Sequence, residues 1–174
     1  MAESTASTTA GEQYGARLAG YVKGKDPIAM QREAPATLAS LIETLPEEKL
    51  RQPPAPGKWS VAAILAHLAE AELVSGWRYR QMIERSGAPL SAFDQEEWAR
   101  LGAYDSRDPR ESLTLFRLLR EANLRMFANL TPEEWQRFGM HAERGRMTVQ
   151  DLASQVAGHD MSHIEQVRQI VAAH

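Results

Sequence analysis

Two histidines stand one helical turn apart near the end of the chain. His159 and His163 are separated by four positions, and Val156 and Val167 continue the same three- and four-residue spacing on either side. In an α-helix, side chains at this spacing lie on one face, with their Cβ atoms close together. The pattern therefore places both imidazoles in the apolar stripe of the helix, where both rings can reach one metal ion.

A third histidine occupies a comparable position in an earlier apolar stripe. His67 lies between Ile64 and Ala71, so we expect it to point into the same core. A single buried histidine is usually neutral and satisfied by hydrogen bonds, and that interpretation stays open for each of the three. Three imidazoles packed together without a metal would leave ring nitrogens unpaired, at a cost of about 1 to 3 kcal/mol each. A shared metal removes this cost, because neutral imidazole offers a lone pair.

The chemistry of such a site follows from its ligands. Three histidines with an open coordination position form a Lewis acid centre that lowers the pKa of a bound water or thiol. The chain contains no cysteine, so any reacting thiol has to arrive on a small cosubstrate. Imidazole ligands suit zinc, nickel, copper and iron. We expect the remaining histidines, His141 and His174, to be exposed to solvent, with the alternative that a mobile His141 approaches the site.

Charged residues near the histidines allow other interpretations. The string from His159 to His163 resembles the H-E-x-x-H helix of zinc proteases, with Asp160 in place of the glutamate base, but the third histidine lies far upstream and no flanking strands are expected. Glu72 is a candidate general base or indirect metal contact, although alternating Ala and Glu usually marks the solvent face of a helix. Arg78 and Arg80 could bind carboxylates of a cosubstrate, but charges of this kind are usually solvated.

The histidines have to be positioned by long helices. Apolar periodicity and capping residues predict helices over residues 27–45, 61–85, 109–129 and 149–172, with shorter helical turns at 96–101 and after Thr131. The connection over residues 87–107 is long enough to join parallel neighbours. No strand-type alternation of useful length is apparent. These features predict an all-α protein, a four-helix bundle with long crossover connections.

Length and composition limit the other possibilities. A chain of 174 residues suits one domain, which we place at residues 25–174, after a flexible arm at residues 1–24 that we expect to be loose or to lie on the surface. The net charge of −3 argues against nucleic-acid binding. The N-terminus has no apolar signal, and no stretch approaches the roughly 20 apolar residues of a membrane helix. We therefore expect a cytoplasmic protein without a membrane partner.

Two segments resemble the DinB/YfiT-like superfamily. The first runs from Gly57-Lys58-Trp59-Ser60 to His67-Leu68, with Glu72 beyond it, and the second is Gly158-His159-Asp160-Met161-Ser162-His163-Ile164. The resemblance extends over residues 21–171. It implies a four-helix bundle, commonly a homodimer, in which His67, His159 and His163 bind nickel, zinc or a related divalent ion such as iron.

The resemblance also suggests activities. Phe93-Asp94-Gln95 resembles an element found in part of the superfamily, which makes Asp94 and Gln95 candidates for contact with the substrate or with a metal ligand; both are equally suited to capping a helix. Members of the superfamily include thiol S-transferases and a mycothiol-dependent isomerase. We therefore expect metal-dependent transfer of a low-molecular-weight thiol to a small electrophile. A metal-dependent hydrolase, or a metal-binding or interaction module without catalysis, remains an alternative.

Overall fold

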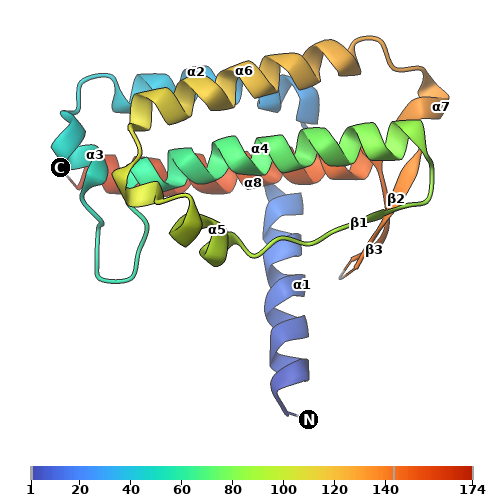
Figure 1. Cartoon of the computed structure of the whole chain (residues 1–174), viewed down its shortest axis with the longest axis horizontal. Helices are drawn as coiled ribbons and strands as arrows, with labels where there is room; N and C mark the ends of the chain where they lie inside the picture. Colours follow the sequence, from blue (N-terminus) through green and yellow to red (C-terminus); the bar gives the residue numbers. More distant parts are fainter. Residues whose placement is uncertain (1, 143, 174) are drawn as a thin grey trace.

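Four long helices form the body of the protein (Figure 1). The computed structural model describes residues 2–142 and 144–173, with side chains from residue 11 onward. The long helices are α2 (Pro27–Ile42), α4 (Val61–Glu84), α6 (Pro109–Phe127) and α8 (Val149–Ala172). Each begins after a residue whose side chain accepts a hydrogen bond from a backbone N–H group of the first turn, namely Asp26, Ser60, Asp108 and Thr148. These four helices lie within three residues of the predicted ranges.

The bundle is a ring in which α4 and α2 each pack against both α6 and α8. Helices α4 and α6 run parallel to each other, and α2 and α8 run in the opposite direction (Figure 1). Parallel neighbours require a long return connection, and residues 85–108 supply it. This segment contains α5 (Gln95–Leu101) and the short 3-10 helix η1 (Tyr104–Ser106). The predicted four-helix bundle with a long crossover is confirmed.

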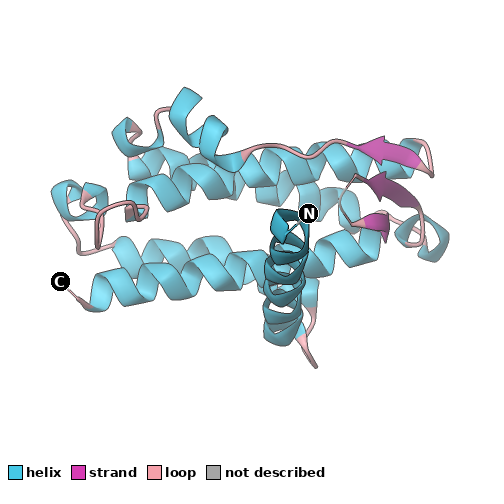
Figure 2. Cartoon of the chain, turned by 90° about the horizontal axis from the view of Figure 1, so that it is seen from below, coloured by secondary structure: helices cyan, strands magenta, loops and turns pink. Residues whose placement is uncertain are grey.

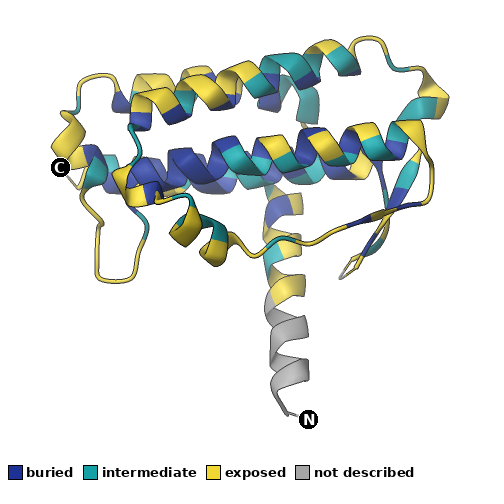
Figure 3. Cartoon of the chain, viewed as in Figure 1, coloured by how far each residue is buried: buried dark blue, intermediate teal, exposed yellow. Residues whose placement is uncertain are grey.

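The first half of α4 is buried on every side, which explains the environment of His67. All residues from Val61 to Ala69 are buried, because α6, α8 and η1 cover this half of the helix (Figure 3). Tyr104 of η1 packs against Ala63 and Ala66. A histidine in such a segment is necessarily desolvated.

Three short strands lie at one end of the bundle, so the expectation of a chain without strands is wrong. Strand β2 (Phe138–His141) lies between β1 (Ala88–Leu90), to which it is parallel, and β3 (Gly145–Thr148), to which it is antiparallel. Segments of three or four residues are too short to show a reliable alternation of polar and apolar residues. The β1–β2 pairing also joins segments far apart in the sequence.

The N-terminal helix α1 (Ala2–Val22) projects away from the bundle, as Figures 1 and 2 show. Its second half packs across α8, where Leu18 is 2% exposed. A Cβ atom at Gly158 would lie 2.5 Å from the carbonyl oxygen of Leu18, so this contact requires glycine. The segment for which we expected a loose or surface-lying arm is thus helical over Ala2–Val22. The docking depends on close backbone approach, which hydrophobic periodicity does not reveal.

The remaining helices are short. They are α3 (Glu47–Arg51) and α7 (Pro132–Trp135). Among the described residues, no helix combines the length and the apolar character needed to cross a membrane. The prediction for His174 falls outside the described residues.

Candidate metal centre

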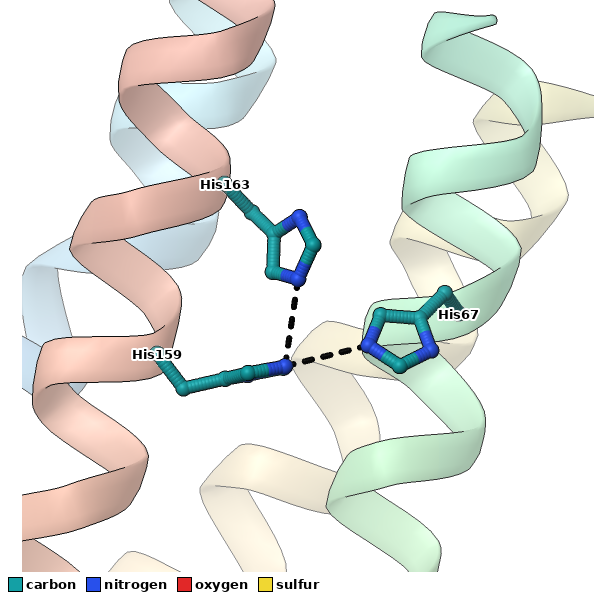
Figure 4. A group of neighbouring side chains, drawn as sticks. All are labelled: His67, His159 and His163. Atoms are coloured by element: carbon teal, nitrogen blue, oxygen red, sulfur yellow. Dashed lines mark hydrogen bonds between the residues drawn. The ribbon is translucent and has the colours of Figure 1, made fainter. Parts of the chain in front are cut away.

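The three predicted histidines converge on one point between α4 and α8 (Figure 4). The Nε2 atom of His159 lies 3.0 Å from Nε2 of His67 and 3.1 Å from Nε2 of His163. Two nitrogens bound to one tetrahedral zinc ion at the usual bond length lie about 3.3 Å apart. The spacing of the ring nitrogens is therefore close to what a single ion needs.

The ring nitrogens cannot all be satisfied by one another. A neutral imidazole carries either a hydrogen or a lone pair on Nε2, yet Nε2 of His159 faces two other ring nitrogens. In addition, Nδ1 of His67 is buried and has no hydrogen-bond partner among the described residues. A divalent ion that accepts one lone pair from each ring relieves the conflict at Nε2, so the donor set fits a metal.

Gln166 sets the tautomer of one histidine. Nδ1 of His163 donates a hydrogen bond to Oε1 of Gln166 over 2.7 Å, which leaves a lone pair on Nε2. This outer contact is the usual device by which proteins orient a metal-binding imidazole. Sequence analysis missed Gln166, although its position one turn after His163 on the same helix was a usable signal.

Burial keeps the histidines neutral. It lowers the pKa of His67 to about 3, with a further contribution from His163. Burial also lowers the pKa of His163 to about 4, although the hydrogen bond that His163 donates to Gln166 opposes this shift. The pKa of His159 falls well below its ordinary value through burial and the neighbouring histidines. All three rings are therefore in the form that binds metal at neutral pH.

These pKa values predict that zinc binding at pH 5.5 releases almost no protons. Three histidines with ordinary pKa values near 6.5 would be mostly protonated at this pH and would release nearly three protons in total. Here the rings of His67 and His163 are already neutral, because their pKa values of about 3 and about 4 lie below the working pH. Calorimetric titrations in two buffers of different ionisation enthalpy count the protons. Release of two or more per ion would contradict the desolvated triad.

The histidines face a cavity of about 890 Å³. Its walls come from α1, α4, α5, α8 and the loop before α4, and they include Trp59, whose ring centre lies 4.9 Å from that of His67. Within the described part of the chain, no fourth histidine or carboxylate joins the three ring nitrogens. A bound ion would thus keep a coordination position open toward the cavity, as catalytic sites do.

The sequence of the chain matches a known protein family. The family described as the DinB superfamily matches residues 31–167, a range that contains all three histidines. The chain belongs to the DinB superfamily. The match begins inside α2, so helix α1 lies outside it.

Individual DinB relatives cover most of the chain. "Putative metal-dependent hydrolase YfiT" of Bacillus subtilis is 23% identical over 144 residues, which are 82% of this chain and 81% of the relative. "Putative metal-dependent hydrolase OB0782" of Oceanobacillus iheyensis is 26% identical over 136 residues, 78% of each chain. The solved structure of YfiT, described as a four-helix bundle with an unusual topology, superposes with a TM-score of 0.79 at 22% identity and covers 84% of this chain and 85% of YfiT.

Two of the candidate acids bind an arginine that sequence analysis missed. Arg120 donates to Glu72 over 2.8 Å and to Asp160 over 2.7 Å, and all three side chains are buried in the DinB bundle. The suggestion that Glu72 lies on a solvent face is therefore wrong. Asn123 also donates to Glu72, over 2.7 Å, and Arg120 donates to the backbone oxygen of Gln31. The two carboxylates are committed to this ion cluster.

The pKa values of Arg120 and Asp160 are both raised in the ion cluster. Burial alone lowers the pKa of Arg120, but Asp160 and Glu72 outweigh it and raise this pKa above its usual range. Burial raises the pKa of Asp160 to about 6, although Arg120 opposes the shift. The spacing of Phe116, Arg120, Asn123 and Phe127 on α6 is that of one helix face, and this was the signal available in the sequence.

Of the other residues considered in the sequence, Asp94 caps a helix, whereas Gln95 and His141 line the cavity. Asp94 caps α5, since its side chain accepts hydrogen bonds from the backbone N–H groups of Glu96 and Glu97, whereas Gln95 lines the cavity. His141 also lines the cavity and is only 8% exposed, so the expectation of an exposed His141 is wrong. Its strand lies in the middle of the small sheet, which the sequence did not predict.

Proposed function

We propose that this protein is a metal-dependent enzyme that transfers a low-molecular-weight thiol to a small electrophile. His67, His159 and His163 would hold one divalent ion, with nickel or zinc expected from the family resemblance and iron as a further candidate. The observation that carries the proposal is the convergence of three Nε2 atoms at an open cavity without a fourth ligand among the described residues. A bound ion of this kind lowers the pKa of a thiol or water that reaches it.

The surroundings of the triad favour a thiol over water as the nucleophile. A thiol has a pKa of about 8.5 and needs less assistance from a general base than water does. Glu72 and Asp160 are held by Arg120, and Glu96 is the carboxylate among the described residues that line the cavity. In the transfer, the thiol sulfur forms a bond to the electrophilic carbon, the leaving group departs with its bonding electrons, and the thiol proton passes to solvent.

Hydrolysis is the second candidate, and the names of the relatives favour it. YfiT and OB0782 are both named putative metal-dependent hydrolases. The same open position suits water, whose pKa falls to about 7 on zinc held by three histidines. A metal without any catalytic role is the third alternative, and inactivity of the metal-loaded protein toward both classes of substrate would favour it.

Parallel assays separate the candidates. Zinc- or nickel-loaded protein is incubated with cysteine and 1-chloro-2,4-dinitrobenzene, and conjugate formation is followed; 4-nitrophenyl acetate without thiol measures hydrolysis. We expect turnover in the thiol assay that is abolished in a His163→Ala variant. Thiol-independent ester cleavage with the same histidine dependence would instead identify a hydrolase. Turnover unchanged in the variant would contradict both.

The homodimer predicted from the resemblance stays a proposal. Leu73 and Trp77 lie one turn apart on α4 and are 53% and 64% exposed. An apolar pair of this kind is compatible with a surface that pairs with a second copy.

A further inference from the structure

The cavity in front of the histidines has a positive lining. The described residues that line it include one carboxylate, Glu96, and four basic side chains, namely Arg17, Lys58, Arg78 and Arg144. The chain as a whole carries a net charge of −3. The cavity lining is therefore positively charged although the protein as a whole is negatively charged. A concave site with an excess of one sign of charge attracts ligands of the opposite sign.

Two of these cations form no ion pair with a carboxylate among the described residues. Within the described part of the chain, neither Arg17 nor Arg144 forms an ion pair, whereas Arg51, Arg100, Arg107, Arg117, Arg120 and Arg168 do. The guanidinium of Arg17 lies over the ring of Tyr14, 5.1 Å from its centre. An arginine without a carboxylate partner keeps its planar set of N–H donors for an external oxyanion.

The two arginines come from different segments and act at the same place. Burial raises the pKa of Tyr14, and both Arg17 and Arg144 oppose the shift. Both arginines also line the cavity that the three histidines face.

Helix α1 is held where it can contribute to this cavity. Leu18 follows Arg17 and is buried against α8 at Gly158, next to His159. Tyr14, one turn before Leu18, lines the cavity as well. Since α1 lies outside the matched DinB range, its side chains add a wall that the family description does not cover.

We propose that Arg17 of α1 and Arg144 of the β2–β3 turn bind an oxyanion of the small molecule that reaches the histidine triad, so that this protein selects anionic substrates. The inference rests on the proposed function and names the substrate class for the same site. The shared chemistry is a carboxylate or a phosphate group, either of which accepts paired hydrogen bonds from a guanidinium.

Binding of simple anions tests the proposal without any turnover. Zinc-loaded and metal-free protein are titrated calorimetrically with succinate, inorganic phosphate and uncharged succinamide. Arg17→Gln and Arg144→Gln are compared with Arg32→Gln, which removes the same charge from an exposed position on α2. We expect Kd for the preferred anion to rise about tenfold or more in each cavity variant, because a charge-assisted contact is lost, and to stay unchanged in the control. The relative affinities of succinate and phosphate identify the oxyanion.

A second variant addresses the position of α1 and not its charge. Leu18→Asp places a carboxylate in the contact with α8 and should release α1, so it is expected to weaken anion binding at least as much as Arg17→Gln. Equal anion affinity in Arg17→Gln, Arg144→Gln and Arg32→Gln would overturn the inference, as would failure of the parent to bind either anion more tightly than succinamide.

Metal content measured on the same samples separates the two proposals. Arginine-dependent anion binding in a parent that takes up no metal would support the anion site and refute the metal-dependent function. Stoichiometric metal in every variant, with anion binding that is indifferent to both arginines, would refute the anion site alone.

Discussion

An Arg120→Met variant is expected to lose about 3 to 5 kcal/mol of unfolding free energy, because it leaves two buried carboxylates without their cation. Glu72, Asp160 and Arg120 are each no more than 2% exposed as side chains. Methionine retains much of the apolar stem but none of the hydrogen bonds. Urea unfolding followed by circular dichroism measures the loss.

Arg117→Met is the matched control for this substitution. Arg117 lies on the same helix and pairs with Glu121, but both side chains are solvent-exposed, so the expected loss is below about 1 kcal/mol. Replacing the whole cluster, with Glu72→Gln, Arg120→Met and Asp160→Asn together, should restore part of the stability, because no buried charge is then left unpaired. Equal losses for Arg120→Met and Arg117→Met would contradict the interpretation of the cluster as a buried ion network.

A divalent ion is expected to stabilise the folded chain by about 4 kcal/mol when its free concentration is a thousand times Kd. The ion would bind His67, His159 and His163 together only in the folded state, since α4 and α8 bring them within reach of one another. Thermal unfolding of chelator-treated protein with added zinc or nickel measures the shift. In a His159→Ala, His163→Ala variant the shift should vanish.

The metal-free protein should nevertheless remain folded. Two large apolar clusters hold the bundle without the histidines, one around Leu38, Leu65 and Phe116 and the other around Tyr79 and Leu152. An unfolding transition that disappears on chelation would instead indicate a structural metal. An equal thermal shift in the double variant would place the ion elsewhere.

The ion cluster and the candidate metal centre share two helices, α4 and α8. Asp160 follows His159 on α8, and Glu72 lies little more than one turn after His67 on α4. Arg120 of α6 joins both carboxylates. The two helices that carry the metal ligands are therefore fastened to each other through α6, close to the place where the rings meet.

Features with a local cause were predictable from the sequence. Side-chain capping of a helix start is a local effect. It predicted the starts of the four long helices at Asp26-Pro27, Ser60, Asp108-Pro109 and Thr148, and the structure has a side-chain cap at each of them. The pairing of His159 with His163 follows from the helical repeat alone. His67 could be placed on an apolar face, but its distance from the pair depends on how α4 packs against α8.

Features that depend on tertiary contact were not predicted. The burial of Glu72 results from the position of Arg120 on a neighbouring helix, and its alternation with alanine suggested a solvent face instead. His141 is covered because the sheet that contains β2 packs against α4, which is distant from it in sequence. The docking of α1 depends on the missing Cβ atom of Gly158. In each case a partner distant in sequence outweighs the local pattern.

The most direct test of the metal centre is elemental analysis of untagged protein purified without added metal, beside the His159→Ala, His163→Ala variant. The triad predicts about one zinc, nickel or iron ion per parent chain, the number that a single three-histidine site holds, and loss of that ion in the variant. Absence of metal from the parent, even after incubation with each of these ions, would contradict it.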